Sequence, residues 1–160
     1  MNSAFSLGFA HALHVLSAVA WIGGMLFTVL VLRPALLKLN PPLEPAQRLG
    51  IFNAVLKRFF ILVWHAVILI LLSGYWLLLA RFGSFASAPL YVHLMHIAGL
   101  AMAVLFFYLY FAAYRPMKRA VAQQTLPVAA ESLEKIRRIV QINLLLGLVV
   151  VVIATAGRYF

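Results

Sequence analysis

Two pairs of histidines, each spaced His-x-x-His, interrupt apolar segments of this 160-residue chain. His11 and His14 lie in FAHALHVLSAVAWIGGML, and His93 and His96 lie in YVHLMH. A fifth histidine, His65, stands alone in another apolar segment. Neutral imidazole binds copper, zinc and haem iron well, and its pKa lies near neutrality. These residues therefore point first to metal or haem binding.

The residues that the chain lacks exclude several other kinds of chemistry. There are no cysteines and only three acidic residues, none of them inside an apolar segment. Thiolate metal sites, cysteine nucleophiles, paired-carboxylate hydrolysis and carboxylate-rich calcium or magnesium sites are therefore not expected. The net charge of +10 is carried between the apolar segments and not on an amphipathic face. The sequence therefore does not indicate a nucleic-acid partner.

The elements that must position the histidines are membrane-spanning helices. Hydrophobic residues make up 66% of the chain, and a spanning helix needs about 20 apolar residues. The composition predicts an all-α fold, an integral membrane four-helix up-down-up-down bundle in the lipid bilayer, with residues 1–160 forming a single transmembrane domain. No internal repeat is evident beyond the histidine pairs. The expected helices cover approximately residues 5–32, 45–81, 89–120 and 128–157, the first ending at Arg33-Pro34.

The distribution of cations predicts the orientation of these helices. Eleven Lys and Arg residues lie in or beside the first and third connections, whereas only Arg81 and Arg158 lie on the other side. Cytoplasmic segments of membrane proteins carry the excess of Lys and Arg. Both termini are therefore expected in the periplasm, and the chain is expected to be a multi-pass protein of the bacterial inner membrane.

The histidine pairs fall at matched depths on the first and third helices. At ~1.5 Å per residue, His14 and His96 lie roughly 6–8 Å from the middle of their segments, towards the outer face, and His11 and His93 lie one turn further out. His65 is about 15 Å away along the axis. Each pair shares a helical stripe with other polar or aromatic residues, Trp21 among them, so both stripes are expected to face the bundle interior. Gly23, Gly24 and Gly99 are expected at close helix contacts.

Two ligands fit this layer of imidazoles, and the residues alone leave both open. His14 and His96 form the best-matched axial pair for a b-type haem, with His11 and His93 as a second pair. Arg81 and Arg158 would neutralise haem propionates, and many aromatic residues suit a large flat ligand. The same four histidines would instead bind one copper ion through three or four nitrogens. A third interpretation is an assembly subunit whose histidines only bridge helices. The aromatic residues are Trp21, Trp64, Tyr75, Trp76, Tyr91, Phe106, Phe107 and Tyr108.

The stretch LHVLSAVAWIGGMLFTVLVLRPAL resembles the first helix of the CopD family of bacterial inner-membrane proteins. The matching residues are His14, the Trp-Ile-Gly-Gly stretch that begins at Trp21, and Arg33-Pro34. The chain also resembles HemJ-type protoporphyrinogen oxidases, through the seven-residue spacing of His14 and Trp21, through His93, and through a Met-Lys pair after the third segment. It departs from them at Met95, where those proteins carry lysine. The resemblances imply a histidine-liganded bundle, with haem b in HemJ-like proteins and copper in CopD-like ones.

The leading hypothesis from the sequence is a b-type haem redox protein with ligands in the periplasmic half, serving electron transfer or a HemJ-like oxidoreductase reaction. A redox protein or a quinone would be its partner. His65 would ligate a second haem nearer the cytosol. The alternative is a CopD-like copper transport or resistance protein that uses the same outer histidines, with His65 as an inner relay and a periplasmic copper-binding protein as its partner. The sequence leaves the oligomeric state open.

Overall fold

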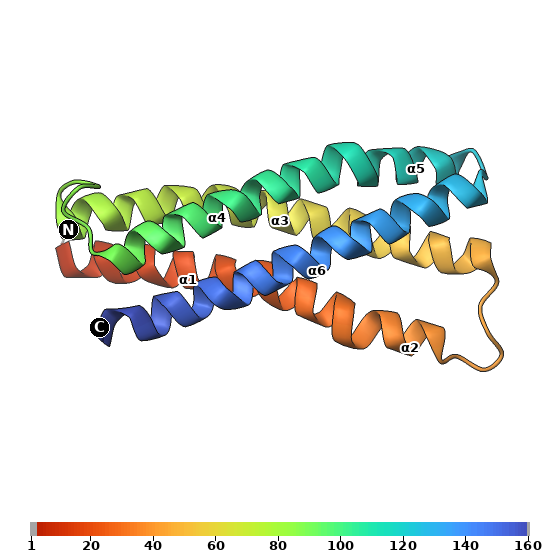
Figure 1. Ribbon diagram of the computed structural model, residues 1–160, viewed down its shortest axis with the longest axis horizontal. Coiled ribbons are helices and arrows are strands. Elements are labelled where there is room, and N and C mark those ends of the chain that lie inside the picture. Colours follow the sequence, from red (N-terminus) through yellow and green to blue (C-terminus); the bar gives the residue numbers. More distant parts are fainter. Residues whose placement is uncertain (1–2, 160) are drawn as a thin grey trace.

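The computed structural model describes residues 3–159, including every side chain in this range except those of Ser3 and Arg158. Four long helical rods run antiparallel in sequence order, and both termini lie at the same end (Figure 1). All four are long and apolar enough to span a membrane. This confirms the predicted all-α four-helix architecture. The rods comprise α1 (Ser3–Phe27), η1 (Thr28–Leu32) and α2 (Arg33–Leu37); α3 (Pro45–Phe82); α4 (Leu90–Leu109), η2 (Tyr110–Tyr114) and α5 (Arg115–Ala122); and α6 (Leu126–Ala156), followed by the short η3 (Gly157–Tyr159).

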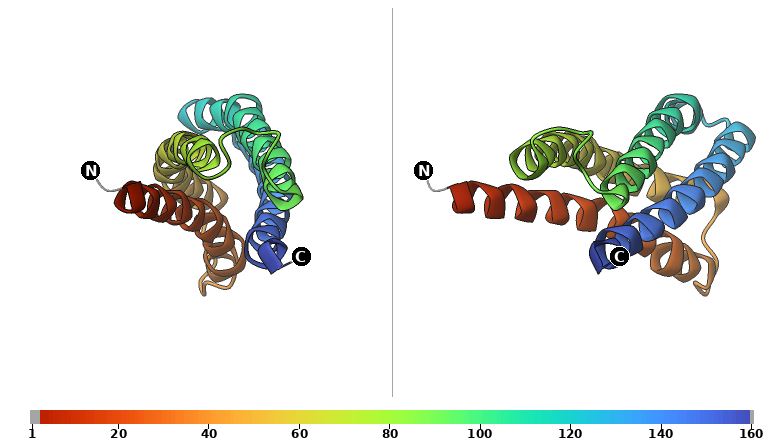
Figure 2. Two further views of the ribbon diagram at one scale, coloured as in Figure 1. Left: turned by 90° about the vertical axis from the view of Figure 1, so that its left-hand side faces the viewer. Right: turned by 60° about the vertical axis from the view of Figure 1, so that its left-hand side comes forward.

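The bundle consists of two helical hairpins packed side by side. The most extensive packing joins α1 to α3 and α4 to α6, and the end-on view in Figure 2 shows these two pairs on opposite sides. Gly24 allows the first hairpin to close tightly, because a Cβ atom there would lie 2.6 Å from the ring of Phe59. Gly23 and Gly99, also expected at contacts, have nothing within 4 Å of such an atom.

Aromatic side chains fill the middle of the bundle. Phe60 and Phe106 are 1% exposed and lie 5.9 Å apart between ring centroids. Trp64 meets Phe106 edge-on at 5.4 Å, and Tyr114 lies 4.4 Å from Phe60. Large apolar side chains also cover the outside of all four rods, as is required of a surface that faces lipid. The hydroxyls of Ser17, Thr28, Ser73 and Thr155 each donate to a carbonyl one turn back in their own helix.

The first and third rods each contain one π-helical turn directly before an Arg-Pro pair. The Arg33 N–H donates to the Thr28 carbonyl, and the Arg115 N–H donates to the Tyr110 carbonyl. Proline lacks an N–H and its ring collides with the carbonyl four residues back, so an inserted residue relieves the strain of continuing the helix. The first rod therefore continues to Leu37 and does not end near Leu32 as expected.

The two π turns reveal a correspondence between the two halves of the chain. An offset of 82 positions separates His11 from His93, His14 from His96, and Arg33 from Arg115. The same offset relates η1 to η2 and the proline in the first turn of α3 to that of α6. The expectation of no repeat beyond the histidine pairs overlooked the Arg-Pro pairs and the prolines in the first turns of α3 and α6, which share this offset while the residues between them differ.

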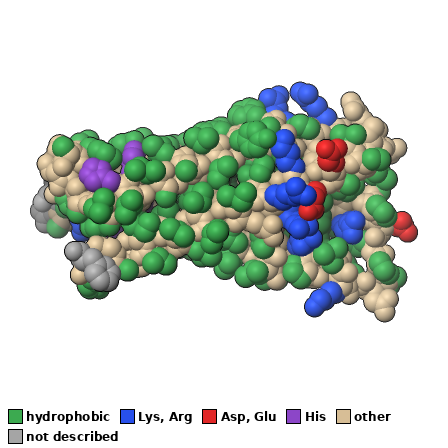
Figure 3. All heavy atoms as spheres, in the orientation of Figure 1, with side chains coloured by type: hydrophobic (Ala, Val, Ile, Leu, Met, Phe, Trp, Pro, Cys, Tyr) green, Lys and Arg blue, Asp and Glu red, His purple; other side chains and the backbone are tan. Residues whose placement is uncertain are grey.

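Most of the charged side chains and the two histidine pairs lie towards opposite ends of the bundle. Nearly all the cationic side chains visible in Figure 3 lie at the end remote from the termini, and the visible histidines lie near the termini. Between them the surface is apolar. The separation fits a molecule whose middle crosses a hydrocarbon layer.

Candidate functional site

His14 is held against α3 by a set of polar groups that belong to one turn of that helix. Its Nδ1 lies 3.1 Å from the Ile70 carbonyl oxygen and 3.1 Å from Ser73 Oγ. The Ser73 hydroxyl donates to Leu69 O, so its oxygen can accept from the imidazole. Gly74 provides the room, because a Cβ atom there would lie 3.0 Å from His14 Cε1. The ring is therefore fixed by α3, the other helix of its hairpin, and not by α4.

His93 and His96 lie in the first two turns of α4, beside the loop that joins it to α3. His93 Nε2 donates to the Ala88 carbonyl at 3.0 Å, and its ring packs edge-on against Phe85 at 4.4 Å. His96 lies 5.1 Å from the same Phe85 ring. Its Nε2 is 3.5 Å from the hydroxyl of Tyr75 on α3. The Phe85 ring thus contacts both α4 histidines.

Hydrogen bonds to carbonyl oxygens fix which nitrogen of His14 and His93 keeps a lone pair. A carbonyl only accepts, so His14 carries its proton on Nδ1 and His93 carries its proton on Nε2. The free lone pairs are consequently on Nε2 of His14 and Nδ1 of His93. Metal-binding histidines usually have this arrangement, in which the second nitrogen donates to a carbonyl or carboxylate.

The other two histidines lie on the outside of the bundle. The helical spacing predicted His11 on the inward stripe, but its side chain is exposed. His65 is also exposed, and its Nδ1 donates to the Ile61 carbonyl of its own helix at 2.8 Å. Neither ring therefore shares the half-buried position of His14.

The residues expected beside a haem, apart from the histidines, have other neighbours in the structure. Trp21 is 4% exposed and packs edge-on against Phe106 at 6.0 Å. Arg81 is exposed near the end of α3, and the side chain of Arg158 lies outside the described part of the chain. Among the aromatic residues expected around a haem, Trp64 packs edge-on against Phe107, and Phe107 packs against Phe106.

The structure does not gather the predicted ligands into one closed site. Across the described residues, no group of three or more His, Asp or Glu side chains is arranged to hold one metal ion. His14 belongs to the α1–α3 contact, whereas His93 and His96 belong to the start of α4. The expectation that the first and third helices face each other through their histidines overlooked the hairpin packing. Serine-glycine at Ser73-Gly74, within an apolar run, was the sequence signal for the actual partner of His14.

A family of known proteins matches most of this chain. Residues 53–156, from within α3 to the end of α6, match the family described as CopD, Copper resistance protein D. The chain belongs to the copper resistance protein D family. This membership confirms the resemblance to CopD proteins and identifies a multi-pass membrane protein of a copper-related family. No curated protein and no solved structure was found to match.

The CopD match covers some of the histidines and not others. His65, His93 and His96 lie within it, while His11 and His14 precede it. The contacts of His14 with Ile70 and Ser73 nevertheless tie the N-terminal helix to the matched region.

Proposed function

We propose that this CopD protein takes up copper ions at its histidine-bearing end and passes them into or across the membrane. The family match over residues 53–156 carries this proposal. Copper is the cargo, and imidazole nitrogens are suitable ligands for it. His14, His93 and His96 are the residues we assign to it, with exposed His11 as a first contact.

Separate imidazoles suit a cargo ion better than a closed set of ligands. Conduction requires binding that is strong enough for entry and weak enough for release, usually over several sites. Nε2 of His14 and Nδ1 of His93 each offer a lone pair while the other nitrogen is held by a carbonyl. Because the two rings are fixed on different helices, each can bind the ion without forming a trap of three or four ligands.

The orientation and partner follow from the charge distribution. By the positive-inside bias we assign the cationic end of the bundle to the cytoplasm, so that the two histidine pairs and both termini would lie in the periplasm of a bacterial inner membrane. Copper would then arrive from the periplasm, and a periplasmic copper-binding protein is the partner that this route requires.

Copper accumulation in cells tests the proposal. Cells expressing the protein should accumulate more copper than cells without it, measured by elemental analysis at equal membrane abundance of the protein. A His14→Ala, His96→Ala double variant should lose the excess. His65→Ala is the matched control and should keep it, because that ring lies on the outer surface of α3. Equal accumulation in all these cells would refute copper uptake and favour histidines that only bridge helices.

Haem b is the competing ligand that the sequence suggests, and the geometry lends it little support. His14 and His96 would have to ligate opposite faces of one ring, yet each is engaged with α3, His14 through Ile70 and Ser73 and His96 through Tyr75. An absorption spectrum of the purified protein, oxidised and reduced with dithionite, decides between the ligands when combined with iron and copper analysis. A sharp reduced α band with stoichiometric iron would replace copper by haem and restore the redox role.

A further inference from the structure

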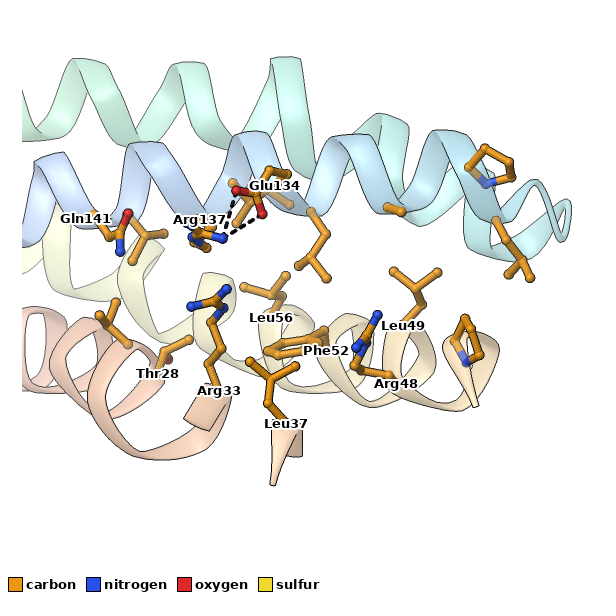
Figure 4. Close-up of a pocket in the computed structure, with 18 residues that line it drawn as sticks. Thr28, Arg33, Leu37, Arg48, Leu49, Phe52, Leu56, Glu134, Arg137 and Gln141 are labelled. Atoms are coloured by element: carbon orange, nitrogen blue, oxygen red, sulfur yellow. Dashed lines mark hydrogen bonds and ion pairs between the residues drawn. The ribbon is translucent and has the colours of Figure 1, made fainter. Parts of the chain in front are cut away.

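A cavity at the cationic end of the bundle has no part in the proposed copper route. It has a volume of about 500 Å³ and lies between η1 and α2 on one side and α3 and α6 on the others. Figure 4 shows its lining, with side chains from all of these elements pointing inward. The two histidine pairs, His11 with His14 and His93 with His96, lie towards the opposite end of the molecule.

Three arginines from three different segments line this cavity. Arg33 comes from α2, Arg48 from the first turn of α3 and Arg137 from α6. Glu134 is the one acidic residue among the lining residues, and its carboxylate pairs with Arg137 Nη1 at 2.8 Å. In the described part of the chain, Arg33 and Arg48 have no ion pair or side-chain hydrogen bond, although Arg33 is half-buried. The cavity therefore has an excess of positive charge.

Two further features favour an anion in the cavity. The Nε atom of Arg137 is buried without a hydrogen-bond partner, so one guanidinium donor is still available inside the protein. Helices α3 and α6 both begin at the cavity, since Pro45 and Pro127 belong to its lining. Their N-terminal dipole ends add partial positive charge. A buried, unpaired donor and converging cations are costly unless an anion neutralises them.

The rest of the lining is apolar, which restricts the kind of anion. Leu49, Phe52, Leu56 and Val140 face the cavity beside the arginines. A small hydrated anion would leave these surfaces in contact with water, whereas an amphiphile would cover both parts. Basic pockets between membrane helices on the cytoplasmic side are known to receive phosphate headgroups of anionic lipids.

We propose that this cavity binds an anionic phospholipid, with its phosphate between Arg33, Arg48 and Arg137 and part of an acyl chain against the apolar lining. Arginine suits this role because its planar fork donates two hydrogen bonds to phosphate oxygens. Glu134 opposes binding, since it already occupies one donor of Arg137. The lipid would join α2 to α3 and α6, which otherwise diverge at this end (Figure 1).

Thermal unfolding of the purified full chain in a mild non-ionic detergent tests this proposal. The midpoint temperature is followed while dihexanoyl phosphatidylglycerol is added, and an apparent Kd is obtained from the concentration dependence. Dihexanoyl phosphatidylcholine and inorganic phosphate are titrated in parallel. Phosphatidylglycerol should raise the midpoint at concentrations where neither of the others does.

Four variants locate the effect. Arg33→Gln and Arg48→Gln should each weaken the apparent affinity by about tenfold, as expected for loss of a charge-assisted contact. Arg138→Gln is the matched control on α6, because Arg138 does not line the cavity. Glu134→Gln should strengthen binding, because it frees Arg137. An increase cannot result from damage to the fold.

Each of the opposite results would overturn the proposal. Equal stabilisation by phosphatidylcholine would mean that only the acyl chain is recognised. An equal effect of inorganic phosphate would identify a free-anion site and not a lipid site. Equal losses in Arg138→Gln and Arg33→Gln would indicate general surface charge, and an unchanged affinity in Glu134→Gln would remove Arg137 from the site.

Discussion

His14 shows how much of a site depends on a neighbouring helix. Its ring is hydrogen-bonded to Ile70 and Ser73 and lies over Gly74, so the turn of α3 from residue 70 to 74 supplies its hydrogen-bond partners. In hydrocarbon these contacts are needed, because an imidazole without partners would be costly to bury. A change on α3 should therefore alter the chemistry of a residue on α1.

Gly74→Ala tests this dependence. The new Cβ atom would lie 3.0 Å from His14 Cε1 and 3.4 Å from Nδ1, so the ring must shift and its bond to Ile70 O must weaken. If the copper proposal holds, the affinity for copper should fall by about tenfold, the usual effect of disturbing groups that orient a ligand. Isothermal titration with copper on the purified protein provides the measurement.

Gly23→Ala is the matched control for this substitution. Gly23 lies in α1, and a Cβ atom added there would have nothing within 4 Å, so alanine should leave copper affinity unchanged. Both substitutions gain the same helix propensity, up to about 1 kcal/mol. Identical affinities in the two variants would show that the position of the His14 ring does not matter for copper.

Helical spacing in the sequence did not predict the direction of every histidine side chain. Residues three apart on a helix point about 60° away from each other. At the edge of an inward stripe this angle is enough to turn His11 outward while His14 is half-buried. The direction of each ring depends on where the neighbouring helix lies, and that neighbour is α3, which the matching depths of the first and third helices did not reveal.

At the scale of the helices, proline and glycine determine how the rods continue and how closely they approach. An Arg-Pro pair was expected to end the first helix, but η1 takes up the strain and α2 continues in the same direction. Such a turn requires only one additional residue in the hydrogen-bond ring, and nothing in the apolar sequence around Thr28 marks it. Close contacts were equally hard to predict, because they depend on the rotation of each helix.

Gly147 is the glycine at which three helices meet. A Cβ atom there would lie 3.0 Å from Ile22 of α1 and 3.1 Å from Met102 of α4. Gly147→Leu should force α6 away from both helices and destabilise the protein by about 1–3 kcal/mol, the usual cost of overpacking. The midpoint of thermal unfolding in detergent should fall accordingly. Gly99→Leu on α4 is the control, and an equal decrease there would show that close packing at Gly147 is not the cause.

For the whole molecule, hydropathy was sufficient to predict four spans and insufficient to predict their assembly. Each rod has at least 31 residues and contains a stretch apolar enough to cross a membrane, as the composition predicted. The pairing of α1 with α3 and of α4 with α6 depends on side-chain fit, for example Gly24 against Phe59. Since lipid is as apolar as the helices, patterns of hydrophobic residues carry little information about such pairing.

The orientation of the bundle is the property on which both proposals depend. The chain has no cysteine, so single cysteines can report on each end. Ala86 is exposed in the connection between α3 and α4, at the histidine end, and Gln123 is exposed in the connection between α5 and α6, at the cationic end. The positive-inside bias predicts that Ala86→Cys faces the periplasm and that Gln123→Cys faces the cytoplasm.

A membrane-impermeant maleimide added to intact cells should therefore label Ala86→Cys and leave Gln123→Cys unlabelled until the inner membrane is permeabilised. Equal labelling after permeabilisation serves as the control for thiol reactivity. The reverse pattern would place the histidines in the cytoplasm and the arginine cavity towards the periplasm. Copper would then meet the histidines only on its way out of the cell, so the protein would act in export, and the cavity would take its lipid from the outer leaflet.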